Sequence, residues 1–567
     1  MRKVLIFGID GATFDILECE EFEFPNIRKL IAEGVKAPFR SVFPPITFTA
    51  WPSIFTGVNP GKHGIFGFGV LGEDGRKKPF GVHDLKVKTL WEYAGEAGRK
   101  VCVLNVPVTY PAFPVNGIMI SGWPVPLQGL EKGVCYPREL IREYPVLANP
   151  YIYIYPVSTY YRDPNRVVTT LREIENTWKR VMIELYEKEE WDVFVIVFRS
   201  TDIIQHLYLH AFDPEHPFYE ASKEKIWKSA IYEVFREIDD ALGLLMERVS
   251  PDTHIYVISD HGLETIRIEI STFLLFKEWG LLRFVSPREM LYRKLFLKAE
   301  GKKGIKKKML ELMAKVAQRL PEWISQGILY LRNPNADFLN IDWERTLAYQ
   351  IGVMEGIYLN LRGREKWGVV EEEKKEELIE EIITRFRMLN KEKRIIKRVV
   401  RRDEVHSGPY IHLSPEIYVE CEPHVLLSNA PVRFRDLFKR PSVGPVNNRT
   451  LPAYHSTLGI FIAWGEGIKK GKTLEEIHLV DFAPTVMSDL GLPVPEEMDG
   501  RVRKEIFIKS PEIKFKNIPI FMFTARSAES DKNIGQQMGA DEYIPKSASM
   551  EELEELVEKI NSYLKKE

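Results

Sequence analysis

Short runs of apolar residues recur along this chain, and each run ends in turn-forming or polar residues. The clearest runs are VLIFGID (4–10), VCVLNVP (101–107), VFVIVFRS (193–200), HIYVISD (254–260) and GIFIAWG (459–465). Between several of them the apolar positions recur at helical spacing, as in residues 26–34 and 225–249. Continuous apolar strands that alternate with helices predict an α/β fold, in which a largely parallel sheet is covered by helices on both faces.

Acidic and imidazole side chains follow three of these predicted strands. Asp10 and the pair Asp260–His261 stand at the ends of apolar runs, and Asp202 lies just past another. Ligands of parallel α/β sheets bind beyond the carboxyl ends of the strands. We therefore expect the loops at this edge of the sheet to gather these residues into a site.

Length and charge favour one large catalytic unit with inserted or appended pieces. The chain has 567 residues, which is well past the size at which a single core stops growing. Its 79 Lys and Arg residues nearly balance its 81 Asp and Glu residues. The chain therefore lacks the overall charge of a dedicated nucleic-acid-binding protein, and we expect no specific nucleic-acid partner.

Cysteine usage and hydropathy favour a soluble, cytoplasmic protein. The four cysteines include no C-x-x-C pair, so neither a disulfide framework nor a thiolate metal site is indicated. The first apolar run is too short for a signal peptide, and no stretch approaches the roughly 20 apolar residues that span a bilayer. The sequence does not indicate an oligomeric state.

The pattern along the chain divides it into four parts. We expect a first part of the catalytic core (1–280), a basic, helix-rich insertion or cap (281–345), a second part of the core (346–510) and a small C-terminal α/β appendage (511–567). The insertion contains the run RKLFLKAEGKKGIKKKMLELMAKVAQRL. Such a run covers a site, offers a surface to an anionic lipid or substrate, or forms a solvated amphipathic helix pair, which is the common outcome for charge runs.

Two pairs and two single residues offer oxygen and imidazole ligands near strand ends. Asp202 and His206 are spaced i, i+4, so that on a helix both side chains lie on one face and can share a metal ion. Asp260 and His261 are adjacent on a turn, where they either reach one ion or simply form an Asp-initiated turn or helix cap. The single residues are Asp10 and His455.

Thr47 lies in the segment SVFPPITFTAWPSIFTGVNPGKHGIFGF (41–68). A threonine hydroxyl is a poor nucleophile at its own pKa, and the chain shows no Ser-His-Asp elbow that would activate it. A metal ion that binds the alkoxide provides the same activation.

Together these positions resemble the alkaline phosphatase superfamily, over roughly residues 1–505. The branch that they resemble is the type I phosphodiesterase and nucleotide pyrophosphatase group, which includes archaeal predicted phosphohydrolases or phosphomutases. The segments NVPVTYP (105–111), YLNLRGRE (358–365) and DFAPTVMSDLGLP (481–493) resemble the same branch. The matching functional positions, in chain order, are Asp10, Thr47, Asp202, His206, Asp260, His261 and His455.

The resemblance implies a three-layer sandwich with two divalent metal ions. In this family pattern one ion is held by Asp202, His206 and His455, and the other by Asp10, Asp260 and His261, with Thr47 bridging toward the second ion as the nucleophile. Two ions about 4 Å apart clamp the attacking and leaving oxygens of an in-line displacement. Oxygen and nitrogen ligands suit Zn²⁺ or Mn²⁺. We favour zinc, because related diesterases and phosphatases use it whereas related phosphoglycerate mutases use manganese.

Three positions near Thr47 need separate interpretation. Phe68 stands 21 residues after Thr47, where nucleotide pyrophosphatases carry an Asn that helps to bind a phosphate oxygen, so nucleotide specificity is not implied. Thr49 stands where a Pro commonly follows the Thr-Phe pair; it is an alternative nucleophile whose spacing fits less well. His63 matches no metal position, and we expect it to position the nucleophile loop.

The predicted function is hydrolysis of a small-molecule phosphoester through a phospho-threonine intermediate. A diester is favoured because diesterase and phosphoethanolamine-transferase relatives use Thr, whereas phosphatases and mutases more often carry Ser. A phosphomonoesterase or phosphomutase is the alternative enzyme. The alternative from another class is a catalytically inactive, metal-binding regulatory protein.

The last part of the chain, residues 513–567, resembles the second half of a response-regulator receiver domain. Thr524 and Lys546 match the Thr and Lys of that family, but its first half, with the acidic pair and the phospho-accepting Asp, has no counterpart here. Since a site needs its complete set of residues, we expect a small docking module without chemistry or a fusion remnant.

Overall fold

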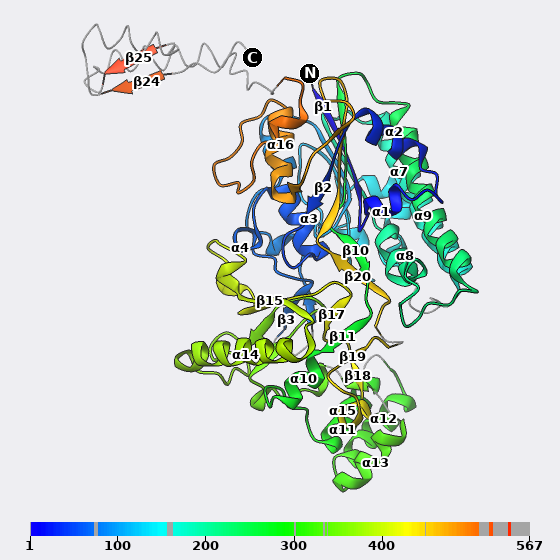
Figure 1. Ribbon diagram of the computed structural model, residues 1–567, viewed down its shortest axis with the longest axis vertical. Helices are drawn as coiled ribbons and strands as arrows, with labels where there is room; N and C mark the ends of the chain where they lie inside the picture. Colours follow the sequence, from blue (N-terminus) through cyan, green and yellow to red (C-terminus); the bar gives the residue numbers. More distant parts are fainter. Residues whose placement is uncertain are drawn as a thin grey trace. The chain divides into compact units, whose positions relative to one another are not determined.

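The computed structural model divides the chain into two units, Met1–Pro511 and Glu512–Glu567. It describes residues 2–72, 77–155, 163–299, 302–332, 335–336, 338–447 and 450–509, together with two strands of the second unit. Figure 1 shows the elements of the first unit, which contains a large sheet at one end and a cluster of helices at the other.

A ten-stranded sheet forms the centre of the first unit. Its strand order is β22-β2-β21-β9-β1-β8-β5-β6-β7, with β23 also pairing with β2. Neighbouring strands from β9 to β6 are parallel, whereas β21 runs antiparallel to both β2 and β9, and β7 runs antiparallel to β6. The bounds are β1 Lys3–Ile9, β2 Val35–Arg40, β5 Val101–Val106, β6 Gly117–Ser121, β7 Cys135–Tyr136, β8 Val193–Phe198, β9 Thr253–Ile258, β21 Leu458–Trp464, β22 Lys472–Thr473 and β23 Ile477–His478.

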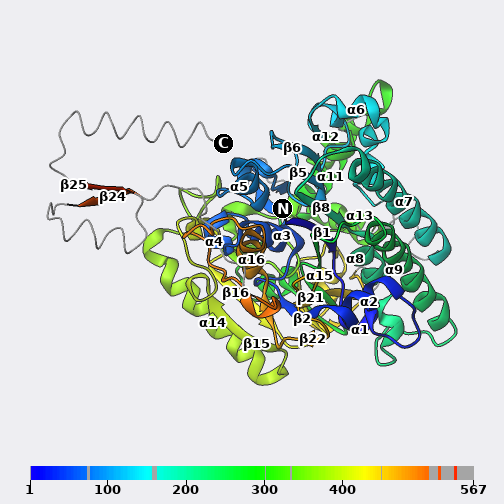
Figure 2. The same ribbon diagram turned by 90° about the horizontal axis from the view of Figure 1, so that it is seen from above.

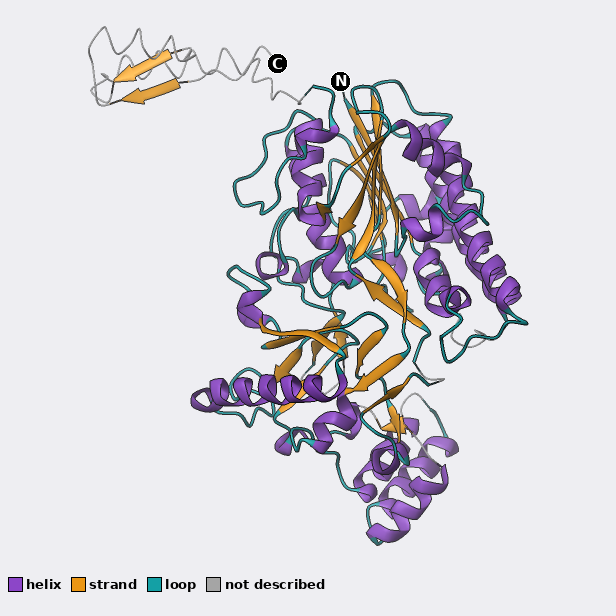
Figure 3. Cartoon of the chain, in the orientation of Figure 1, coloured by secondary structure: helices purple, strands orange, loops and turns teal. Residues whose placement is uncertain are grey.

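Helices cover both faces of this sheet, as Figures 1, 2 and 3 show. Because side chains alternate along a strand, β1 sends Leu5, Phe7 and Ile9 into one core and Val4 and Ile6 into the other. The first core packs against α2 (Pro25–Glu33), α7 (Pro164–Lys188), α8 (Ser200–Tyr208) and α9 (Glu224–Met246). The second packs against α3 (Thr47–Thr56), α5 (Leu90–Glu96) and α16 (Phe482–Asp489). The predicted α/β fold with a largely parallel sheet between two helical layers is confirmed.

A second lobe with its own hydrophobic core lies beyond the carboxyl ends of the parallel strands (Figure 1). It contains an antiparallel sheet of order β13-β14-β16-β15 and a three-stranded sheet of order β17-β11-β19. The first sheet is formed by β13 Ala348–Gln350, β14 Ile357–Leu359, β15 Ile396–Arg401 and β16 Ile417–Cys421. The second is formed by β11 Ile268–Ser271, β17 Val425–Ser428 and β19 Val443–Pro445. The longest described helix of the lobe is α14 (Glu372–Lys393). Helix α10 (Thr272–Glu278), which follows β11, also belongs to this lobe.

Three helices fall within the range 281–345 for which the sequence indicates a basic, helix-rich insertion. They are α11 (Pro287–Ala299), α12 (Ile305–Ala317) and α13 (Glu322–Arg332). Both α12 and α13 pack against α11. In Figure 1 the three helices form the end of the first unit that lies farthest from the amino-terminal ends of the parallel strands.

Several short elements complete the described part of the first unit. The strands are β3 Gly69–Leu71, β4 Lys77–Pro79, β10 Gly262–Thr265, β12 Asn335–Ala336, β18 Val432–Arg433 and β20 Ala453–Ser456. The short helices are α1 Phe14–Leu17, α4 Pro60–His63, α6 Leu140–Glu143 and α15 Asp436–Lys439. Among the residues that the structure describes, none of the helices is both long and apolar enough to cross a bilayer.

In the second unit the structure describes two parallel strands, β24 (Phe521–Thr524) and β25 (Glu542–Pro545). Thr524 closes the first strand. Lys546 lies outside the described residues. The resemblance of this segment to half a receiver domain stays a prediction.

Candidate metal centre

The sheet register places two acidic residues side by side at the carboxyl edge. Strands β1 and β9 are parallel neighbours, with Gly8 opposite Ile258. The chain leaves both strands two residues later, at Asp10 and at Asp260. Asp10 and Asp260 therefore lie side by side, because residues equally far past the ends of adjacent parallel strands meet at the same edge of the sheet.

Two further elements bring the remaining ligand candidates to the same place. Helix α8 begins after β8, the other neighbour of β1, and carries Asp202 and His206 one turn apart on one face. His455 lies on β20, which pairs with β10 so that His455 is opposite Leu263, two residues after His261. Antiparallel pairing therefore brings a residue from far along the chain beside the turn that follows β9.

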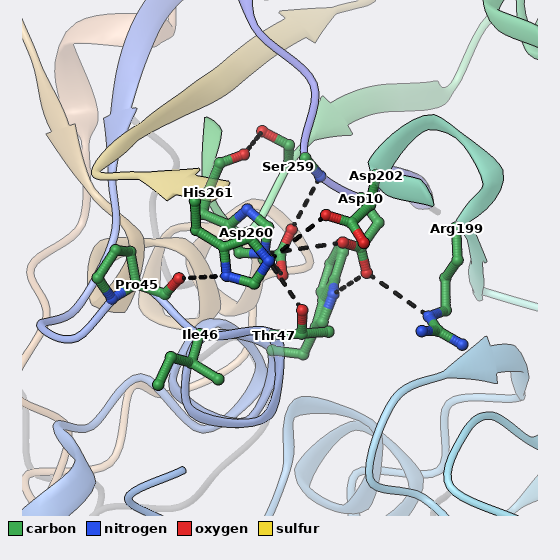
Figure 4. Close-up of polar contacts among 12 residues, drawn as sticks. Asp10, Pro45, Ile46, Thr47, Arg199, Asp202, Ser259, Asp260 and His261 are labelled. Carbon is green, nitrogen blue, oxygen red and sulfur yellow. Dashed lines mark hydrogen bonds and ion pairs between the residues drawn. The ribbon is translucent and has the colours of Figure 1, made fainter. Parts of the chain in front are cut away.

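Thr47 is the first residue of helix α3 and faces this cluster. Its Oγ1 lies 3.2 Å from Nε2 of His261, and Figure 4 shows its side chain turned toward Asp10, Asp202 and His261. Helix α3 ends at Thr56 and is capped by Gly57, whose φ of 69° is the left-handed conformation that glycine adopts readily. The structure thus brings together all seven residues that the sequence singles out, and none of them is more than 8% exposed.

Three imidazole rings present the same nitrogen to the centre of the cluster. The ring Nδ1 of His206 donates to the carbonyl oxygen of Ala453, that of His261 to Gly262 and that of His455 to Pro45. A carbonyl oxygen only accepts, so Nδ1 carries a proton in all three rings, and in a neutral ring Nε2 carries a lone pair. Asp202 raises the pKa of His206, so this ring shares a proton with Asp202 in the absence of a metal ion. Burial, with the charge of a neighbouring ring, lowers the pKa of His261 and His455, which keeps both rings neutral at neutral pH.

These nitrogens face acceptors rather than donors. Nε2 of His206 lies 3.1 Å from Nε2 of His455 and 3.2 Å from Oδ1 of Asp202. Nε2 of His261 lies 3.1 Å from Oδ2 of Asp260. The buried carboxylate oxygens Asp10 Oδ1, Asp202 Oδ1 and Asp260 Oδ2 have no hydrogen-bond partner among the described residues. Lone pairs crowded in this way repel one another unless protons or a cation lie among them, and a cation that displaces the protons would have all of these atoms as ligands, so the residues fit a metal site.

The distances define two overlapping groups of ligand atoms. One contains Asp10, Asp260 and His261. On the other side, Asp202 Oδ1 lies 3.2 Å from Nε2 of His206 and 3.5 Å from Nε2 of His455. His261 is within reach of both groups. Three carboxylates and three imidazoles, all oxygen and nitrogen, are ligands that Zn²⁺ and Mn²⁺ accept.

Burial and neighbouring charges give the three carboxyl groups different pKa values. Burial, together with the charge of Asp202, raises the pKa of Asp10 to about 8. Burial and the charge of Asp10 raise the pKa of Asp260 well above its usual range. Burial opposes ionisation of Asp202 as well, but His206 holds the pKa of this carboxyl well below its usual value. The metal-free site therefore keeps protons that a bound cation would displace.

Sequence reasoning missed two side chains that contact the ligands. Nε1 of Trp51 donates to Oδ2 of Asp10 at 3.2 Å. Nε of Arg199 lies 3.8 Å from the same oxygen, as Figure 4 shows, and its guanidinium lies over the ring of Trp123. Trp51 stands four residues after Thr47, on the same face of α3, so helical spacing was a usable signal for it. No comparable signal marks Arg199.

His63 lies outside the metal-ligand cluster and holds helix α3 in place. Its Nε2 donates to Oγ of Ser53 at 2.8 Å, and that hydroxyl donates to the carbonyl oxygen of Thr49. The amide of Ile65 donates to Nδ1. Burial lowers the pKa of His63 to about 3, so the ring stays neutral. These contacts connect the α4 loop to the helix that carries Thr47.

Phe68 occupies an aromatic cluster. Its ring centroid lies 5.1 Å from that of Phe48 and 6.0 Å from that of Trp123. Its amide donates to Oε1 of the buried Glu355. The position where nucleotide pyrophosphatases carry an amide side chain is therefore apolar in this chain.

A buried set of carboxylates and imidazoles beside a hydroxyl at a helix N-terminus is the kind of site that metal-dependent hydrolases use. A family profile described as type I phosphodiesterase / nucleotide pyrophosphatase matches residues 4–431. The chain belongs to this family and is a phosphoester hydrolase. The family resemblance and the enzyme class expected from the sequence are both confirmed.

Comparison with curated protein sequences gives no match. Among solved structures, human ectonucleotide pyrophosphatase / phosphodiesterase 5 is 14% identical, with a TM-score of 0.46 over 90% of this chain and 100% of that chain. The murine protein is 14% identical, with a TM-score of 0.44 over 88% and 98%. A variant of alkaline phosphatase PafA is 15% identical, with a TM-score of 0.48 over 89% and 99%. Family membership rests on the profile match.

Proposed function

We propose that the chain hydrolyses a small-molecule phosphodiester through a covalent intermediate on Thr47. Two divalent ions would be held by Asp202, His206 and His455 on one side and by Asp10, Asp260 and His261 on the other. The observation that carries the proposal is the position of the Thr47 hydroxyl, 3.2 Å from Nε2 of His261 and at the first residue of α3.

The two candidate hydroxyls of α3 have different surroundings. Oγ1 of Thr49 donates to the carbonyl oxygen of Ile46, the N-cap residue of its own helix, at 2.9 Å. Oγ1 of Thr47 faces the carboxylates and imidazoles instead. The helix N-terminus adds positive potential at Thr47, which favours both an alkoxide and a bound phosphoryl group. This contrast supports Thr47 as the nucleophile and leaves Thr49 a structural role.

The donor set supports zinc as the resident metal, because imidazole nitrogen is a preferred zinc ligand and each ion would receive at least one. When bound, the ions lower the pKa of a coordinated hydroxyl and neutralise charge on the phosphoryl oxygens. The backbone carbonyls of Ala453, Gly262 and Pro45 fix the tautomer and the orientation of the three imidazoles. The ligands are thereby held in place before substrate arrives.

In the reaction that we propose, Oγ1 of Thr47 loses its proton and attacks phosphorus while the bond to the leaving oxygen breaks, and this oxygen takes up a proton and departs as the alcohol. Water then attacks the phospho-threonine and restores the hydroxyl. Arg199, which is 6% exposed, offsets part of the negative charge of Asp10.

The four cysteines are free thiols, which supports a reducing, cytoplasmic setting.

The test compares Thr47→Ala with its neighbour Thr49→Ala, using an aryl phosphodiester and an aryl phosphomonoester with Zn²⁺ and Mn²⁺ added back to stripped protein. Thr47→Ala should keep both ions, since six other ligands remain, and lose turnover by on the order of 10³-fold or more. Thr49→Ala should lose far less. Equal effects of the two changes would overturn the assignment of Thr47, and faster turnover of the monoester would overturn the assignment of the diester.

A further inference from the structure

Helix α12 exposes a stripe of large apolar side chains. Ile305, Met309, Leu312 and Val316 are 86%, 53%, 63% and 52% exposed. Their spacing of four, three and four residues confines them to roughly 60° of the helix circumference, at about 100° per residue. Single exposed apolar residues are ordinary on a protein surface, but a continuous stripe of them marks a contact surface.

The same helix packs into the second lobe through a different face. Ala314 and Ala317 are buried, and Leu310 is packed against the same core, so these three residues form the inward side. The stripe is therefore not the face by which α12 folds onto α11. Met313, which is 40% exposed, lies between the two faces.

Positive charge surrounds the stripe. The lysines of the helix and of the turn before it, with one arginine after it, are Lys302, Lys303, Lys306, Lys307, Lys308, Lys315 and Arg319. The acidic residue of α12 is Glu311, which lies 3.8 Å from Lys307. At helical spacing Lys308 and Lys315 fall on one side of the stripe and Lys306 on the other, whereas Lys307 falls on the opposite face of the helix. The chain as a whole has a net charge of −2, so this density of charge is local to the helix.

We propose that α12 docks on the surface of an anionic phospholipid bilayer. The apolar stripe would enter the boundary between headgroups and acyl chains, and the lysines on both sides would reach the phosphates with their flexible stems. A bound nucleic acid would place its charged phosphates against the apolar stripe, which is unfavourable. A second copy of the helix would bring its lysines close to those of the first, and the like charges would repel one another. The lipid surface matches both the apolar and the charged part of the face.

The position of the helix suits this contact. In Figure 1 helices α11, α12 and α13 form one end of the first unit. The neighbouring helices also expose large apolar side chains, with Phe296 on α11 and Trp323 and Leu331 on α13. Tryptophan is enriched at membrane interfaces, where its ring fits the headgroup region. The metal centre lies at the carboxyl edge of the central sheet, and the proposed docking does not depend on the proposed function.

The test measures binding of the full chain to vesicles of phosphatidylcholine containing about one third phosphatidylglycerol. The charge variant is Lys306→Gln/Lys308→Gln/Lys315→Gln, and the apolar variant is Ile305→Ser/Leu312→Ser/Val316→Ser. A matched control, Arg387→Gln/Lys391→Gln/Lys393→Gln, removes three exposed charges from α14. Because all the substituted side chains are exposed, the thermal unfolding midpoint should stay close to that of the wild type.

We expect the wild type to bind these vesicles and to bind pure phosphatidylcholine weakly. The charge variant should lose on the order of 100-fold in partition coefficient and the apolar variant about tenfold or more, while the control keeps wild-type binding. Absence of wild-type binding at low salt would overturn the proposal, as would equal losses in the control and charge variants. A wild-type dimer that the apolar variant converts to monomer, without vesicle binding by either, would assign the stripe to self-association instead.

Discussion

Replacing Trp51 with Phe isolates one contact of the metal centre. The indole Nε1 of Trp51 donates to Oδ2 of Asp10, and this hydrogen bond favours the ionised carboxyl that a metal ion needs. Hydrogen bonds to charged groups contribute about 1.5–3 kcal/mol. The bond is 3.2 Å long, whereas charge-assisted bonds of this kind are typically about 2.7–2.9 Å, so we take the lower end of the range. The expected result is about a tenfold weaker metal affinity.

Trp91→Phe is the matched control for this experiment. Trp91 is as buried as Trp51, but its Nε1 has no hydrogen-bond partner among the described residues. Both substitutions remove a similar part of a buried ring, so a general loss of packing would affect the two variants alike. Competition with a chromophoric zinc chelator measures the affinity, and excess Zn²⁺ should restore turnover of Trp51→Phe. Equal zinc affinities of the two variants would refute the reasoning.

Three further predictions concern pH and the C-terminal unit. Without metal, Asp10 keeps its proton up to about pH 8, so metal binding must displace that proton. The apparent metal affinity should therefore rise about tenfold per pH unit toward pH 8 for each proton displaced. A metal affinity that titration calorimetry finds independent of pH would contradict this. Burial raises the pKa of Glu355 from 4.5 to about 7, so folding stability falls as pH rises between these values. Glu355→Gln should therefore stabilise the protein by up to about 3 kcal/mol at pH 8 but not near pH 4.5. A difference in unfolding midpoint between variant and wild type that does not change with pH would argue against this. Truncation after Pro511 should preserve turnover, whereas a folded but inactive product would show that the second unit contributes to the site.

The fold was predictable wherever the hydrophobic pattern was long and regular. The apolar runs at 4–10 and 193–200 became β1 and β8, and the helical period at 225–249 became α9. The strands of the second lobe were harder to foresee, because β13 and β14 have three residues each and their burial comes from tertiary packing rather than from a local pattern.

The candidate site was predictable as a set of residues, but not as a set of contacts. The i, i+4 spacing of Asp202 and His206 indicates a shared helical face from sequence alone. The register that places His455 opposite Leu263 depends on pairing between β10 and β20, which are far apart in sequence. The carbonyl groups that orient the imidazoles belong to the backbone, and side-chain motifs carry no information about them.

The stereochemical course at phosphorus tests the central claim most directly. A chiral thiophosphate diester of the preferred leaving alcohol is hydrolysed by the zinc-loaded wild type in water labelled with heavy oxygen, so that the product thiophosphate monoester is chiral at phosphorus, and the configuration of this product is determined. The proposed attack by Thr47, followed by attack of water, gives two inversions and therefore net retention. Net inversion would mean that water attacks the diester directly and that Thr47 is not the nucleophile.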